Sequence, residues 1–167
     1  MAFFLLTLLS VTCFGAYLSF IVAIGGVLSS LSDSYYLLEE RKKNLGVLFY
    51  FCLAATVFNC VAPMCEVAGA FGFLAGFALL LVGVAPRFKE KKSIERILHI
   101  IGAITSASAA IMVLIRAGQI SVIIPVTLLA IILSVITNTF KSCVVWWAEM
   151  VAFYSLFAGL LLHYWPY

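Results

Sequence analysis

Four ionisable side chains stand at or just inside the ends of long apolar runs in this chain of 167 residues: Asp33, Glu95, His99 and Glu149. They stand out because the whole chain has only seven acidic residues and two histidines. Ionisable groups at membrane depth are costly and therefore mark functional candidates. An imidazole beside a carboxylate can accept a proton or bind a polar ligand.

Helical spacing places His99 on a face of small residues. Glu95, His99, Gly102 and Ser106 recur every three or four positions, so they share one face of a helix. Small side chains allow close helix packing inside a membrane. This spacing predicts that His99 faces other helices of a bundle rather than lipid.

A pair between His99 and either Glu149 or Asp33 is therefore predicted. One interpretation is a hydrogen-bonded polar layer that sets the register of the helices. The other is a ligand or catalytic site. In both cases, hydroxyl groups close to Asp33 in the sequence would act as hydrogen-bond donors, namely Ser29, Ser32 and Tyr36.

A three-histidine zinc site is excluded, because His99 and His163 are the only histidines and fall near opposite membrane faces. A site of one histidine and two carboxylates remains open, although we expect no metal and no cofactor. Phosphate-binding loops and hydrolase signature motifs are missing from the sequence. Cys60 and Cys65 lie near one membrane face, where they form either a disulfide or simple packing contacts.

The composition indicates which elements carry these residues. Hydrophobic residues make up 65% of the chain and charged residues 10%, and the mean hydropathy is +1.20. Soluble domains have about 45–50% apolar and about 25% charged residues. The chain is thus predicted to be a small polytopic membrane protein without a soluble catalytic or nucleotide-binding domain, and without a nucleic-acid partner.

Apolar runs of about 20 residues are long enough to cross a bilayer as helices. Their continuous apolar character disfavours a β-barrel, which would alternate every second residue. The first run lacks the basic start of a cleaved signal peptide, so we interpret it as a retained helix. The prediction is one all-α transmembrane bundle over residues 1–167, with six spans at about 3–28, 45–63, 67–85, 94–115, 120–137 and 144–163.

Basic residues predict the orientation. Every Lys and Arg except Arg116 falls in or beside the first, third and fifth loops, which should therefore be cytoplasmic, with both termini outside. This predicts an integral protein of a cell or inner membrane. The same charges can attract anionic lipid headgroups, particularly those of Lys42, Lys43, Lys89, Lys91 and Lys92.

Small residues predict how the helices pack. Gly72 and Gly76 form a ridge that permits close backbone approach, and Gly15 and Ser19 fall near one face of the first span. These faces serve either packing within the bundle or association with a second copy or another membrane protein. Pro125 is expected to kink the fifth span, because it cannot bond to the carbonyl of Ser121.

Three short motifs resemble those of the DRAM/Frag/Sfk-type six-helix membrane proteins. They are Leu31-Ser32-Asp33-Ser34 after the first span, His99-Ile100-Ile101-Gly102-Ala103 in the fourth, and Trp147-Ala148-Glu149 in the sixth. The resemblance implies that Asp33, His99 and Glu149 are the site residues and that the function concerns membrane lipids or lipid-anchored proteins. The eukaryotic relatives place the equivalent first loop on the exoplasmic side, opposite to the orientation that the charges predict.

Three functions are consistent with these features. The first is a polar site that binds a lipid headgroup in the cytoplasmic-side leaflet. The second is a non-enzymatic membrane subunit or scaffold that associates through its helices. The third is a small transporter or channel, which the small number of intramembrane charges disfavours.

Overall fold

The structure, a computed structural model, describes residues 1–42, 44–84 and 94–165. All regular structure in this part of the chain is helical, as the sequence predicts. There are seven α-helices and one 3-10 turn: α1 (Ala2–Gly25), α2 (Asp33–Arg41), α3 (Val47–Ala68), α4 (Ala70–Val84), α5 (Ile94–Arg116), η1 (Ile120–Val122), α6 (Ile123–Ile136) and α7 (Val144–His163).

Four of these helices, α1, α3, α5 and α7, are long and apolar enough to cross a membrane. The apolar helices α4 and α6 are shorter, with 15 and 14 residues. At 1.5 Å per residue the described part of α4 measures about 22 Å and α6 about 21 Å, less than the hydrocarbon thickness of about 30 Å. The helices are therefore typical of a membrane-embedded bundle. The lengths of α4 and α6, however, do not by themselves show that these two helices cross the membrane.

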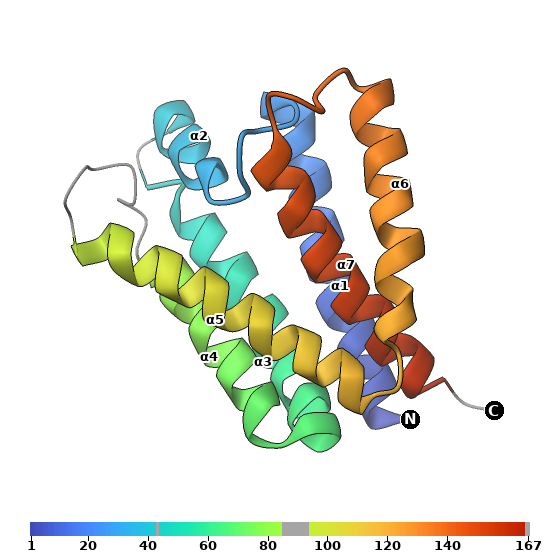
Figure 1. The fold of residues 1–167 in the computed structure, drawn as a ribbon. Coiled ribbons are helices and arrows are strands. Elements are labelled where there is room, and N and C mark those ends of the chain that lie inside the picture. Colours follow the sequence, from blue (N-terminus) through green and yellow to red (C-terminus); the bar gives the residue numbers. More distant parts are fainter. Residues whose placement is uncertain (43, 85–93, 166–167) are drawn as a thin grey trace.

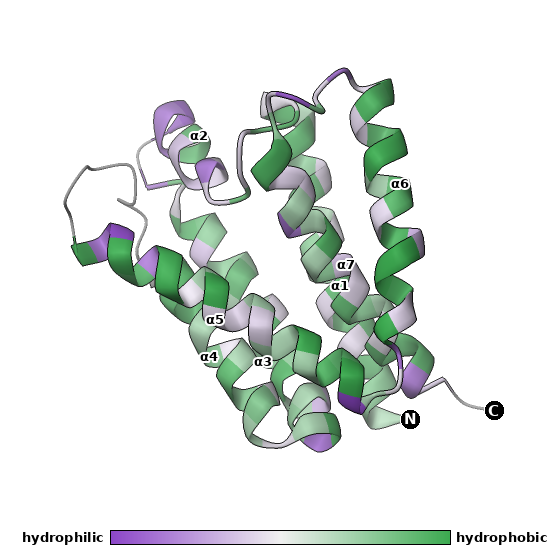
Figure 2. Cartoon of the chain, viewed as in Figure 1, coloured by the Kyte–Doolittle hydropathy of each residue, from purple (hydrophilic) through white to green (hydrophobic). Residues whose placement is uncertain are grey.

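The helices form two groups that meet where α1 contacts α3 and where α5 contacts α7 (Figure 1). One group contains α3, α4 and α5, and the other contains α1, α6 and α7, with α1 also contacting α3. Helix α2 and the α6–α7 connection lie at one end of the molecule, whereas the N-terminus and the α3–α4 turn lie at the other. Figure 2 shows hydrophilic residues gathered near the two ends, with hydrophobic helices between them.

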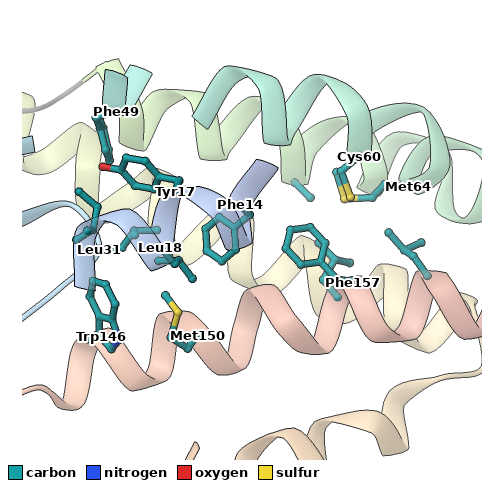
Figure 3. Close-up of a cluster of buried hydrophobic side chains, with 14 of the residues drawn as sticks. Phe14, Tyr17, Leu18, Leu31, Phe49, Cys60, Met64, Trp146, Met150 and Phe157 are labelled. Carbon is teal, nitrogen blue, oxygen red and sulfur yellow. The ribbon is translucent and has the colours of Figure 1, made fainter. Parts of the chain in front are cut away.

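The core lies where α1, α3 and α7 meet (Figure 3). Phe14 of α1 stacks on Phe153 of α7 with ring centroids 4.4 Å apart, and it packs edge-on against Phe157 at 5.6 Å. Tyr17 of α1 packs near Phe49 of α3 at the end of the core that is closer to α2. Large aromatic side chains thus hold α1 between its two neighbours.

Glycine faces bring α4 close to both α3 and α5. A Cβ at Gly72 would collide with the backbone of Met64 in α3, and a Cβ at Gly102 of α5 would lie 2.8 Å from the carbonyl oxygen of Ala78 in α4. Ser106 of α5 donates a hydrogen bond to a carbonyl of α4 over 2.9 Å. The small residues of these two spans therefore pack within the chain, and the predicted face of α5 is confirmed.

Two helix ends differ from the expected ends of the spans. Helix α1 ends at Gly25 rather than near Leu28, because Gly26 adopts φ +72°, which glycine tolerates without strain. The predicted turn after Pro63 is helical, and α3 continues to Ala68 before Gly69, at φ +55°, ends it. Residue 85, the predicted end of the third span, lies outside the described residues.

The predicted kink at Pro125 is also absent. The α-helix begins only at Ile123, after the 3-10 turn, so Pro125 lies in its first turn. Backbone N–H groups in a first turn have no acceptor inside the helix, so proline removes no hydrogen bond there. Pro125 marks the start of α6 rather than a bend within it.

The five cysteines are free thiols, so Cys60 and Cys65 do not form a disulfide. The predicted first loop contains an unexpected helix, α2. Its acidic first residue Asp33 and basic last residue Arg41 favour a helix by matching the helix dipole.

Candidate functional site

The connection between α1 and α2, which we call the 26–32 segment, builds the candidate site. After the turn at Gly26 the segment runs along the beginning of α7. The N–H of Trp146 donates to the carbonyl of Ser29 over 3.2 Å. This N–H belongs to the first turn of α7 and has no acceptor inside the helix, so the segment supplies one.

Glu149 provides the second attachment of the segment to α7. Its Oε2 accepts a hydrogen bond from the N–H of Leu31 over 2.6 Å, across 118 positions of sequence. Leu31 itself is only 7% exposed. This short bond satisfies a backbone N–H of a buried residue, so the carboxyl group of Glu149 holds the middle of the segment in place.

His99 of α5 also contacts the same segment. Its Nε2 lies 3.4 Å from the Oγ of Ser32, and its Nδ1 lies 3.2 Å from the carbonyl oxygen of Val82 in α4. A carbonyl can only accept a hydrogen bond, so Nδ1 carries the proton that bonds to Val82. In the neutral ring, Nε2 then accepts the hydrogen bond of the Ser32 hydroxyl.

Asp33, the first residue of α2, is only 8% exposed. Its Oδ2 accepts a hydrogen bond from the hydroxyl of Ser29, and its N–H lies 3.3 Å from the Oγ of Ser30. The charge of Asp33 also acts on His99 and on Glu149. A carboxylate in the first turn of a helix is stabilised by the helix dipole.

The structure thus gathers five of the seven predicted site residues around the 26–32 segment: Ser29, Ser32, Asp33, His99 and Glu149. Besides the charge of Asp33, which acts on the ring, the hydroxyl of Ser32 and a backbone carbonyl contact His99, and a backbone N–H contacts Glu149.

The other two predicted residues have tyrosines as neighbours. Glu95 acts electrostatically on Tyr50 of α3, and Tyr36 packs edge-on against Tyr35 with ring centroids 5.5 Å apart. Among the basic residues proposed to attract headgroups, Lys42 is exposed. Lys43, Lys89, Lys91 and Lys92 lie outside the described residues.

Two residues of this region escaped the sequence reasoning. The hydroxyls of Tyr17 and Ser34 share a hydrogen bond of 2.5 Å, and Ser34 donates to the carbonyl of Leu31 over 2.6 Å. Ser34 is completely buried. The one available signal was a tyrosine inside an otherwise apolar span, since a buried phenol requires a hydrogen-bond partner.

A second polar group closes the other end of the bundle. The hydroxyl of Tyr164 donates to the carbonyl of Pro63 over 2.9 Å and also contacts the carboxylate of Glu66. Burial, together with Glu66, raises the pKa of Tyr164 above its ordinary value. His163 lies 3.3 Å from the carbonyl of Ala117 at this end, far from His99 along the bundle.

Within residues 1–42, 44–84 and 94–165, no three histidine, cysteine or acidic side chains lie close enough together to hold a metal ion. The alternative of one histidine with two carboxylates as metal ligands therefore has no support in the described part. The site is organised by hydrogen bonds to a loop instead. Comparisons of the chain with protein-family models, with curated proteins and with solved structures find no match.

Proposed function

We propose that this chain is a small integral membrane protein that crosses the bilayer six times and binds a lipid headgroup beside the 26–32 segment. The four long apolar helices support insertion in a membrane. The position of α4 between α3 and α5, and that of α6 along α7, support two further crossings. A short helix can cross a bilayer that thins locally around it.

One observation carries the proposal. The 26–32 segment is bonded to α7 through Leu31 and Glu149 and faces α5 through Ser32 and His99. It therefore gathers hydroxyl, imidazole and carboxylate groups at one end of an otherwise apolar bundle. Because ionisable groups at this depth are costly, their concentration favours a binding role over simple packing.

The site is also open to the membrane interface. Ser29 is exposed, and both His99 and Glu149 are half-buried. A headgroup can therefore reach hydroxyl, imidazole and carboxylate groups from one side. The resemblance to proteins that handle membrane lipids supports the same proposal.

Retention of lipids by the purified protein tests this function. The protein is extracted from vesicles of phosphatidylethanolamine and phosphatidylglycerol, and bound lipids are counted by native mass spectrometry. Asp33→Asn and Glu149→Gln should reduce retention by about tenfold or more, because hydrogen bonds to charged groups contribute about 1.5–3 kcal/mol. Glu66→Gln is the matched control, since this carboxylate lies at the other end of the bundle.

Equal lipid retention by the unchanged chain, Asp33→Asn and Glu149→Gln would contradict the proposal. A reduction that Glu66→Gln reproduces would contradict it as well, because the effect would then not depend on this site.

A second candidate function is association through α1. A Cβ at Gly15 would meet nothing within 4 Å, and Thr12, Ala16 and Ser19 are exposed beside it. This small-residue face can accept another helix closely. Chemical cross-linking in vesicles should capture a dimer that Ala16→Leu abolishes, and a chain that is never cross-linked would exclude this role.

A further inference from the structure

Ser32 occupies a position where serine normally serves its own helix, but here it does not. It is the N-cap residue of α2, yet its side chain makes no capping hydrogen bond. Serine hydroxyls at N-caps usually accept a bond from one of the first backbone N–H groups of the helix. The hydroxyl of Ser32 lies 3.4 Å from Nε2 of His99 instead.

The surroundings of His99 suit it to act as a base. The carbonyl of Val82 fixes the proton on Nδ1, which leaves the lone pair of Nε2 directed at the Ser32 hydroxyl. A nucleophile, a base and a group that orients the base are the parts of nucleophilic catalysis, and their contacts are often long in the absence of substrate.

A hydrogen-bond donor is also present for the negative charge that would develop on the oxygen of an attacked carbonyl group. The N–H of Ser32 has no hydrogen-bond acceptor among residues 1–42, 44–84 and 94–165. It precedes the first turn of α2, where the helix dipole favours negative charge. A backbone N–H beside a nucleophile can stabilise the oxyanion of a tetrahedral intermediate.

We propose that Ser32 and His99 are a nucleophile and base that cleave the acyl ester of a membrane lipid. This inference rests on the proposed function, because the headgroup site would hold the ester next to Ser32. Ser32 is only 5% exposed, while Ser29 beside it is exposed, so the ester approaches along the 26–32 segment.

The reaction follows from these positions. The Ser32 oxygen attacks the carbonyl carbon of the ester, and its proton passes to Nε2 of His99. The bond between the carbonyl carbon and the alcohol oxygen then breaks, and the alcohol leaves with the proton from His99. Water attacks the acyl group on Ser32 and gives its proton to His99, which releases the fatty acid and restores Ser32.

An active-site probe tests the pair directly. The full chain in lipid vesicles is treated with dodecyl fluorophosphonate, and the adduct is located by mass spectrometry of the intact chain and its peptides. We expect one adduct, on Ser32. Ser32→Ala should abolish it, and His99→Ala should slow its formation by about 10²–10⁴-fold. Ser142→Ala, which removes an exposed hydroxyl on the α6–α7 connection, should label at the original rate.

Lipid retention, measured on the same samples, separates the two proposals. Retained lipid without an adduct on Ser32 overturns the catalytic pair but leaves headgroup binding standing. An adduct on Ser32 without retained lipid supports the pair and overturns headgroup binding. An adduct that persists in Ser32→Ala, or that forms equally fast in His99→Ala, overturns the pair, and an unchanged thermal midpoint shows that each variant is folded.

Discussion

Replacing Glu149 with alanine should release the 26–32 segment from α7 while the rest of the bundle stays folded. The carboxylate is the acceptor for the N–H of Leu31 at 2.6 Å. Without the carboxylate of Glu149, the N–H of Leu31 loses this acceptor, and Leu31 is only 7% exposed. Leaving a buried donor without an acceptor costs about 1–3 kcal/mol. Because about 1.4 kcal/mol corresponds to a factor of ten, local opening should become about 10- to 100-fold more frequent.

Amide hydrogen exchange measures this opening. Peptides that cover residues 26–32 should exchange about 10- to 100-fold faster in Glu149→Ala than in the unchanged chain, while peptides from the middle of α3 should not change. Glu149→Gln should show a smaller increase, because an amide oxygen still accepts a hydrogen bond, although a weaker one. Glu66→Ala is the control for loss of a carboxylate at the other end.

Two results would refute this reasoning. Unchanged exchange of the segment in Glu149→Ala would show that the bond contributes nothing to holding it. A uniform increase across all helices would show that Glu149 stabilises the whole bundle rather than the segment.

Three further predictions follow from the packing, the Tyr164 contact and the basic residues. Gly102→Ala should lower the thermal midpoint, with a loss of about 1–3 kcal/mol from overpacking against Ala78, whereas Gly15→Ala should not lower it, because its Cβ meets open space. Tyr164→Phe should lower the free energy of unfolding by about 1 kcal/mol. The raised pKa of Tyr164 means that the folded state holds the phenol proton more tightly than the unfolded state. The unchanged chain should therefore lose this stabilisation as the pH rises above about 10, whereas Tyr164→Phe should not. Equal dependence of stability on pH in the two proteins would contradict the Glu66 contact. A C-terminal alkaline phosphatase fusion in a bacterial host should be active, because both termini are predicted to lie outside. If the C-terminus instead carries an active fusion only with a reporter that works in the cytoplasm, the predicted orientation is reversed.

The helical fold was readable from the chain because of how lipid treats the backbone. A segment surrounded by hydrocarbon must satisfy its N–H and carbonyl groups internally, so an apolar run of sufficient length becomes a helix. For the same reason, the apolar run at 144–163 coincides with α7, and the run at 94–115 differs from α5 by one residue. Helix α2 was missed because a short polar segment has no such constraint and depends on its neighbours for stability.

The candidate site was readable only in part. The spacing of His99, Gly102 and Ser106 indicated the correct packing face, because side chains three or four positions apart project from one side of a helix. It did not indicate that the hydroxyl of Ser32 and the carbonyl of Val82 would contact the ring. Which groups meet depends on the relative rotation and depth of α5 and α7, and these are set by contacts such as that of Leu114 in α5 with Gly159 in α7.

The chain by itself determined which segments are helical and which polar side chains lie near the same end, because both follow from local pattern and length. Tertiary structure alone decided the path of the 26–32 segment and its partners. That path begins where Gly26 adopts a positive φ and is held by the backbone N–H of Leu31 on Glu149. A backbone N–H is the same at nearly every residue, so no sequence pattern marks the one that will bind a carboxylate 118 positions away.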